Sequence, residues 1–257
     1  MSCKSSKQSQ AAQGDRGHVP ALVQKVIAVT FALPAESAEF LRRLRDKSAR
    51  ERNGVWTIRG KIDNRTIEVL HTGVGEKVCR QRLGKFLHEQ KFDRLISAGF
   101  AGALTDDLKV GDLLLAENFS TIDLGERWSS LSSLPIHLAD LLTVPALIDS
   151  REDRNNLART SEAGAVDMET QFIAQACATH GLPLLSFRVV SDTPHNLFPA
   201  SANVLFDIEH QQTHMLKLAT HLLAHPTRLP HLVQFARRIA RVRKILADAL
   251  VEVVRNL

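Results

Sequence analysis

Gly73, Val74 and Gly75 form a short glycine turn that follows an apolar run and precedes a helical pattern. Such a turn can aim backbone N–H groups and the start of a helix at an anion or a sugar hydroxyl. A dinucleotide-binding loop would need a third glycine, where this chain has Val78, and no Gly-Lys-Ser/Thr run follows. The turn therefore indicates either a small-molecule site of another type or a purely structural bend.

Three acidic positions adjoin stretches with the pattern of strands or helices. Glu36 follows the apolar run 26–29, Glu169 lies near the start of a helical pattern, and Asp192 follows the very apolar run 184–190. Carboxyl groups at such positions can take part in a site, or they can simply complement a helix dipole or cap a helix. Their spacing alone leaves both interpretations open.

A metal site is not expected. His210 and His214 are four residues apart on a predicted helix, which is a spacing that could bind a metal ion. No third ligand has suitable local spacing, and no His-Glu-x-x-His motif occurs. The histidines of this region fit a solvated helix face better.

The elements that would position these residues alternate between strands and helices. The apolar runs with the pattern of strands are 26–29, 55–59, 66–70, 95–99, 111–117, 141–144 and 184–190. Helical patterns begin at Pro34, cover 77–89 and 165–180, and fill most of the remaining C-terminal part, with Pro226 and Pro230 as interruptions. This order predicts an α/β domain with a largely parallel sheet, whose site lies beyond the carboxyl ends of the strands.

The charge of the chain is unevenly distributed. The 33 basic and 28 acidic residues give a formal charge of +5, but residues 1–25 hold four basic and one acidic residue, and residues 226–257 hold seven and two. The body between these ends is therefore mildly acidic. This distribution, with 5% aromatic residues and no tyrosine, argues against a nucleic-acid partner.

Hydropathy and cysteine usage indicate a cytoplasmic protein. No run approaches the roughly 18 apolar residues of a membrane-spanning helix, and residues 1–20 lack the apolar core of a secretory signal. Cys3, Cys79 and Cys177 form no CxxC pair, which indicates a reducing compartment. Cys79 and Cys177 fall within helical patterns, as packing residues do.

The chain divides into three expected segments: a disordered basic tail at 1–24, a domain at 25–225, and a basic amphipathic helix at 226–257. Apolar residues of the last segment recur at spacings of three and four, which is typical of a helix that packs on a core. The alternative is contact with an anionic membrane surface, where each basic residue contributes roughly 1 kcal/mol. The basic residues that crowd this helix are Arg237, Arg238, Arg241, Arg243 and Lys244.

Six motifs occur in an order that resembles one protein family. They are Ala32-Leu33-Pro34-Ala35-Glu36, Thr72-Gly73-Val74-Gly75, Ser97-Ala98-Gly99-Phe100-Ala101-Gly102, Leu108-Lys109-Val110-Gly111-Asp112, Val166-Asp167-Met168-Glu169 and Phe187-Arg188-Val189-Val190-Ser191-Asp192. From about residue 25 to 210 the chain resembles the purine nucleoside phosphorylase superfamily of the uridine-phosphorylase-like type. It looks closest to methylthioadenosine/S-adenosylhomocysteine nucleosidases and hopanoid-associated phosphorylase-like proteins. The resemblance implies a three-layer α/β/α sandwich around a twisted mixed sheet.

The resemblance also implies roles in breaking the N-glycosidic bond between ribose and a purine. Asp192 matches the aspartate that protonates the purine at N7, so burial should raise its pKa above the ordinary value. Glu169 matches the glutamate that binds the ribose hydroxyls. Glu36 matches the glutamate that orients or deprotonates the attacking water, and Arg188 lies near that water. The further positions expected to contact substrate are Met168, Gly73, Gly75, Phe100 and Ser191.

Two positions on the far face of the sugar favour hydrolysis over phosphorolysis. Phosphorylases of this type bind phosphate with arginines, and one such position matches Ser97; the serine that is common at the position of Phe100 is also missing. A phosphate dianion without these donors would be poorly held. A phosphorylase with phosphate as co-substrate is the first alternative, and a catalytically weak nucleoside-binding protein is the second. No cofactor is expected.

The implied substrate is a small 5′-substituted nucleoside that releases adenine. The stretch between Glu117 and Asp167 is shorter than in methylthioadenosine nucleosidases, which would leave the 5′ side open to a bulkier group. Together with the basic C-terminal helix, this favours an adenosylated lipid and peripheral membrane contact. Relatives form dimers or larger assemblies, so a homo-oligomer is expected by analogy.

Overall fold

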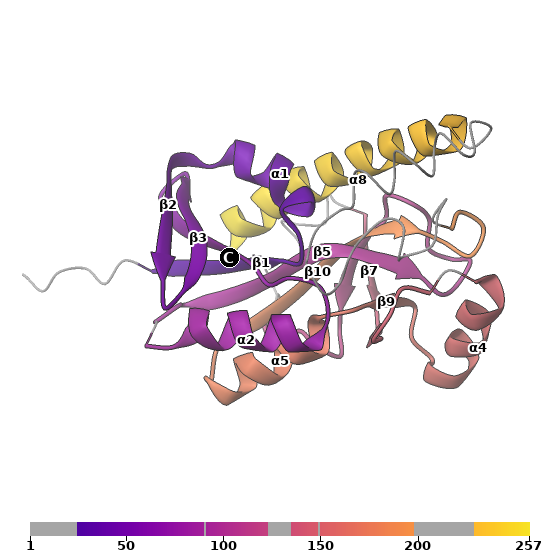
Figure 1. Cartoon of the computed structure of the whole chain (residues 1–257), viewed down its shortest axis with the longest axis horizontal. Coiled ribbons are helices and arrows are strands. Elements are labelled where there is room, and N and C mark those ends of the chain that lie inside the picture. The colour runs from indigo at the N-terminus through magenta and orange to yellow at the C-terminus, as the bar shows by residue number, and fades with distance from the viewer. Residues whose placement is uncertain (1–24, 90, 123–134, 149, 198–228) are drawn as a thin grey trace, which may run out of the picture.

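The computed structural model describes residues 25–89, 91–122, 135–148, 150–197 and 229–257. The predicted tail at 1–24, together with Cys3, His210 and His214, lies outside these residues. The described strands form one mixed sheet with helices on both faces, so the predicted three-layer α/β/α fold is confirmed (Figure 1).

The sheet has ten strands in the described residues. Its main order is β2 (Arg45–Arg52), β3 (Val55–Ile62), β4 (Arg65–His71), β1 (Val26–Phe31), β5 (Arg94–Ala103), β10 (Leu184–Asp192), β6 (Leu113–Ala116) and β7 (Ile136–Ala139). Beside this path, β9 (Ala165–Asp167) pairs with β5, and β8 (Leu141–Thr143) pairs with β9.

The centre of the sheet is parallel. β4, β1, β5 and β10 run in one direction, and their side chains are buried almost throughout. Such continuous burial fits strands that are covered on both faces. The carboxyl ends of these four strands therefore meet at one edge, which is where sheets of this kind place their sites.

The outer strands make the sheet mixed rather than largely parallel. β2 and β3 add to β4 as antiparallel strands, and β6 adds antiparallel to β10. No strand is expected at β2 from the sequence. Seven of its eight residues are exposed, and most are charged, so the strand lacks the apolar alternation by which a strand is recognised.

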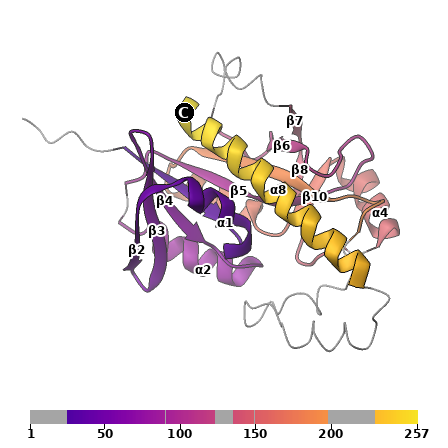
Figure 2. The same cartoon turned by 90° about the horizontal axis from the view of Figure 1, so that it is seen from above.

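Two helix pairs cover the faces of the sheet. α1 (Pro34–Arg43) and α8 (Leu229–Asn256) pack together on one face, and α2 (Glu76–Leu87) and α5 (Thr170–Thr179) pack on the other (Figures 1 and 2). Cys79 and Cys177 are buried in the core beneath α2 and α5. They are packing residues, as the helical patterns indicated.

Residues 165–180 were expected to form one helix, and this expectation is wrong. The stretch begins as β9, whose residues hydrogen-bond to β5 and β8, and α5 starts only at Thr170. Glu169 is the N-cap residue of α5. β9 was not predicted because its three residues, two apolar and one acidic, are too few to show a periodic pattern.

Beside the expected strand at 141–144, the chain forms two elements for which no expectation was stated, β7 and α4 (Arg151–Ser161). Ser150 caps α4, since its hydroxyl accepts the Asp153 N–H at 3.0 Å. The predicted interruption at Pro230 is also corrected. Pro230 is the second residue of α8 and lies in the first turn, where a proline is tolerated.

α8 buries its C-terminal half in the core on its face of the sheet, through Val242, Leu246, Leu250 and Val253. Of its basic residues, Arg238 and Arg243 donate to the carbonyl oxygens of Asn196 and Ala35, both at 3.2 Å. Its exposed basic residues are Arg237, Arg241, Lys244 and Arg255, and the first three lie at spacings of four and three along the helix. No described helix is both long and apolar enough to cross a membrane.

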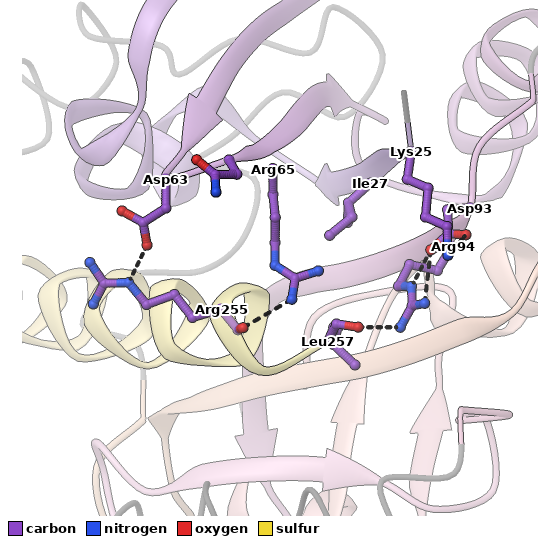
Figure 3. Close-up of a pocket in the computed structure, with 9 residues that line it drawn as sticks. Lys25, Ile27, Asp63, Arg65, Asp93, Arg94, Arg255 and Leu257 are labelled. Carbon is purple, nitrogen blue, oxygen red and sulfur yellow. Dashed lines mark hydrogen bonds and ion pairs between the residues drawn. The ribbon is translucent and has the colours of Figure 1, made fainter. Parts of the chain in front are cut away.

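The C-terminal end of α8 is fastened at the edge of the sheet opposite to the carboxyl ends (Figure 3). Arg94, the first residue of β5, donates to the Leu257 carbonyl at 3.2 Å, and Arg255 donates to Asp63 at 3.0 Å. These residues line a hollow of about 530 Å³. Asp63 and Asp93 pair with basic side chains of the hollow, and Arg65 donates to the Arg255 carbonyl at 3.1 Å. The hollow is therefore a structural junction between α8 and the sheet.

Candidate active site

Glu36 lies at the start of α1, beside the carboxyl end of β5. Pro34 opens the helix, and Glu36 then accepts the Leu33 N–H at 3.0 Å and the Phe100 N–H at 3.1 Å. The side chain is 8% exposed. Burial raises the pKa of Glu36, and the two N–H groups and Arg188 oppose this rise. A carboxyl group with a raised pKa suits proton transfer near neutral pH.

The glycine turn after β4 positions a second carboxyl group. Gly73 and Gly75 have φ angles of 80° and 85°, which residues with a side chain rarely adopt. The Gly75 N–H donates to Glu169 Oε1 at 3.0 Å. The turn thus binds a carboxylate of the chain itself. Burial and then the nearby Asp167 raise the pKa of Glu169 to about 8, while the Gly75 N–H lowers it.

Arg188 and Asp167 form a buried ion pair. Arg188 Nη2 lies 3.0 Å from Asp167 Oδ2, and both side chains are 3% exposed. Arg188 also donates to Ser97 on β5, at 2.5 Å to its carbonyl and 2.8 Å to its hydroxyl oxygen. Asp167 accepts the Thr143 hydroxyl at 2.9 Å. These bonds fix the Arg188 guanidinium between β5 and the start of α5.

The two glutamates and Arg188 share a cavity of about 10 Å³, here called the water-sized cavity. Its other lining residues include Thr30, Thr72, Ser97, Phe100 and Ile173. A cavity of this volume has room for about one water molecule. Three of the predicted functional side chains are therefore brought together around a space that fits a small nucleophile.

Asp192 ends β10 at the same edge of the sheet but does not line the water-sized cavity. Its Oδ2 forms a buried ion pair with Arg154 of α4, and both side chains are 2% exposed. Ser191 donates to its Oδ1 at 2.5 Å. Burial raises the pKa of Asp192, and Arg154 and the Ser191 hydroxyl oppose that rise.

Arg154 of α4 links Asp192 to β5 and to the residues that precede α4. Its Nη1 donates to the Ala103 carbonyl at 3.0 Å, and its Nε and Nη2 donate to the Ile148 carbonyl at 3.2 and 2.9 Å. Gly102 makes room for this arrangement. A Cβ at residue 102 would lie 2.8 Å from Arg154 Nη1 and 3.0 Å from Asp192 Oδ2, closer than side chains tolerate.

The remaining predicted residues lie around these groups. Met168 is partly buried against a small apolar cluster that includes Val144 and Leu157. Phe100 is partly buried against the core beneath α1 and α8, and its backbone N–H, as noted, holds Glu36. Among the described residues, no cluster of histidine, cysteine, aspartate and glutamate could hold a metal ion.

The phosphorylase superfamily profile matches residues 26–130 and 125–224 of the chain. The chain belongs to the phosphorylase superfamily. The resemblance carried by the six motifs is therefore confirmed, and the chain is an enzyme of the nucleosidase or nucleoside phosphorylase type.

Two relatives in the superfamily are 5′-methylthioadenosine/S-adenosylhomocysteine nucleosidases. The protein of Haemophilus ducreyi is 25% identical over 193 residues, which is 62% of this chain and 81% of that protein. The protein of Oceanobacillus iheyensis is 26% identical over 196 residues, 65% of this chain and 85% of that one.

Solved structures of the superfamily share the fold. Futalosine hydrolase of Helicobacter pylori aligns with a TM-score of 0.67 at 17% identity, covering 91% of this chain and 99% of that one. A nucleosidase of Streptococcus pyogenes in complex with 5-methylthiotubericidin aligns with a TM-score of 0.67 at 16% identity, covering 92% and 99%.

Arg154 lies outside the six motifs and was not among the predicted site residues. A signal was available, because Ser150 followed by Asp153 is the pattern that opens a helix, and it marks α4. The partner of Arg154 could not be read from this pattern, since Asp192 is 38 residues away. Thr30 was also overlooked, because it directly follows the apolar run 26–29 and lies inside β1 between apolar neighbours.

Proposed function

We propose that the chain is a nucleoside N-ribosyl hydrolase that releases adenine from a 5′-substituted nucleoside. The observation that carries the proposal is the shared space around Glu36, Glu169 and Arg188, with Asp192 at the same sheet edge. Superfamily membership and the nucleosidase relatives support the same reaction type.

In the proposed reaction, water attacks C1′ of the ribose while the bond from C1′ to the purine breaks. Glu36 takes a proton from the water, and the electron pair of the broken bond leaves with the purine. Asp192 then supplies the proton that neutralises the departing base at N7. Burial raises the pKa of Asp192, which favours the protonated form that can donate. Glu169 binds the ribose hydroxyls.

Water is a better fit than phosphate as the nucleophile. The cavity of about 10 Å³ beside Glu36 fits one water and is too small for a phosphate ion. The groups that could hold phosphate are engaged, since Arg188 bonds to Asp167 and Ser97, and the Phe100 N–H bonds to Glu36. Hydrolysis therefore needs less rearrangement of the site than phosphorolysis.

A panel of nucleosides, incubated with and without phosphate, tests this proposal. Chromatography of the released base should show adenine, formed at the same rate without phosphate. An absolute requirement for phosphate would instead make the chain a phosphorylase. A thermal shift with adenine but no turnover of any nucleoside would indicate a binding protein of the same fold.

For the 5′ group, we propose an adenosylated lipid that is reached through peripheral membrane contact. The support is a row of three exposed basic residues on α8, namely Arg237, Arg241 and Lys244, on the same helix as Arg238. Arg238 is near enough to Asp192 to lower its pKa. Replacing the three exposed residues with glutamine should weaken binding to anionic vesicles and leave hydrolysis of soluble nucleosides unchanged. Equal vesicle binding by the variant would contradict the proposal.

A further inference from the structure

Three hydroxyl side chains form a row across neighbouring strands at the base of the site. The strand register pairs Thr30 on β1 with Ser97 on β5, and Ser97 with Ser186 on β10. Residues paired in this way point to the same face of a sheet. All three are buried, and Thr30 is 0% exposed. Polar groups thus lie on the face that α2 and α5 otherwise cover with apolar side chains.

Two hydroxyls of this row, Thr30 Oγ1 and Ser186 Oγ, have no hydrogen-bond partner among the described residues, whereas the Ser97 hydroxyl bonds to Arg188. Of these two unpaired hydroxyls, Ser186 does not line the water-sized cavity. Thr30 lines the water-sized cavity together with Glu36 and Arg188. Buried hydroxyls nearly always bond to protein or to ordered water. An unpaired hydroxyl beside a space for one water points to a bound water.

A purely structural role would not call for a hydroxyl at residue 30. The next residue on the same face of β1, Ala28, packs in the apolar core beneath α2 and α5. Valine has the shape of threonine, favours strands and leaves no polar atom to be satisfied. The packing of β1 therefore does not account for the hydroxyl, whereas a water in the cavity would give it a partner.

We propose that Thr30 Oγ1 binds a water molecule in the water-sized cavity and positions it as the nucleophile that Glu36 activates. The inference rests on the proposed function, and it identifies Thr30 as the residue that positions the nucleophilic water. Thr30 acts through the water and is a positioning residue. The water oxygen forms the bond to C1′, its proton passes to Glu36, and the bond to the purine breaks with its electron pair on the base. Asp192 protonates the base, so no further reactant is needed.

The chain offers a matched control for the test. Thr66 on β4 is likewise buried, at 3% exposed, and its Oγ1 also lacks a partner among the described residues, but it does not line the cavity. We compare Thr30→Val with Thr66→Val. Losing one hydrogen bond to the water should lower kcat of Thr30→Val roughly threefold to tenfold, with KM unchanged. Thr66→Val should keep wild-type kcat, and Thr30→Ser should restore most of it.

A crystal structure supplies a second readout that does not depend on activity. It should contain a water in the cavity within hydrogen-bond distance of Thr30 Oγ1, and Thr30→Val should lose that water. Equal kcat in the two valine variants, or an empty cavity in the wild type, would overturn the inference. If the wild-type protein released no base from any nucleoside, the proposed function would fail instead, and the crystal structures would still decide whether Thr30 binds water.

Discussion

Glu36 is buried and holds two backbone N–H groups, so its proton affinity differs from that of an exposed glutamate. Glu36→Gln keeps the shape and removes the base, and we expect kcat to fall roughly 100-fold to 10,000-fold. Steady-state kinetics with a nucleoside substrate measures this. Glu39→Gln, one turn along α1 at the surface, is the control and should keep wild-type activity. A fall in kcat of less than tenfold for Glu36→Gln would remove Glu36 from the mechanism.

Asp192 gives a second prediction, which concerns the leaving group. Asp192→Asn cannot protonate the purine, so kcat should fall by orders of magnitude while the protein stays folded. The same assay measures the rate, and circular dichroism checks the fold. Near-normal turnover in this variant would mean that the base leaves without help from Asp192.

Arg154 should set the pH range in which Asp192 can donate. Because Arg154 lowers the pKa of Asp192, Arg154→Met should raise it. A proton donor works below its pKa, so the alkaline limb of the kcat/KM profile should move to higher pH in the variant. The lost ion pair should also reduce the free energy of unfolding, by about 3–5 kcal/mol, in denaturant titrations.

The control for this variant is Arg159→Met, an exposed arginine of the same helix that bonds to Asn156. It should leave both the pH profile and the stability unchanged. An alkaline limb that stays in place or moves to lower pH in Arg154→Met would show that Asp192 does not work as a protonated acid.

At the scale of the element, α4 carries Arg154 into the site, and the Ser150 cap determines where the helix begins. Ser150→Ala removes the bond to the Asp153 N–H and should reduce the free energy of unfolding by about 1 kcal/mol. Since Arg154 lies in the first turn, kcat should fall as well. Ser150→Asp, which can still cap, should behave like the wild type; equal losses in both variants would contradict a capping role.

The elements that could be predicted from sequence are those with a local signature. Pro34 opens α1, the glycine turn ends β4, and long apolar runs mark β1, β5 and β10. β2 and β9 could not be predicted, because a charged edge strand and a three-residue strand are defined by their partners alone. The acidic residues of the site were found through motifs. The bond from Arg154 to Asp192 joins distant segments and needed the structure.

At the scale of the whole molecule, buried acids make the stability depend on pH. The pKa of Glu169 is about 8, whereas the ordinary value is 4.5. As the pH rises between these values, the unfolded chain releases the proton more readily than the native protein, so the native state loses stability. The melting temperature should therefore fall from pH 5 to pH 8.

Glu169→Gln should reduce this dependence, because it removes a carboxyl group whose pKa is raised in the native protein; the effect is on the order of 4 kcal/mol at most. Melting curves at several pH values measure it. Glu76→Gln, at an exposed position of α2, should leave the wild-type dependence intact. A melting temperature that rises with pH over this interval would show that other groups dominate.

The position of α8 has a consequence for the way this protein is made. Residues 242–257 cover the same core that includes β1, the first strand of the sheet, and Arg94 of β5 fastens the end of α8. A ribosome adds about 5–20 residues per second, so the 50 residues from Asp192 to Val242 take roughly 3–10 s. During that interval the apolar side chains that α8 later covers are exposed to other nascent chains. Synthesis of this protein should therefore depend on chaperones that shield these side chains until α8 emerges.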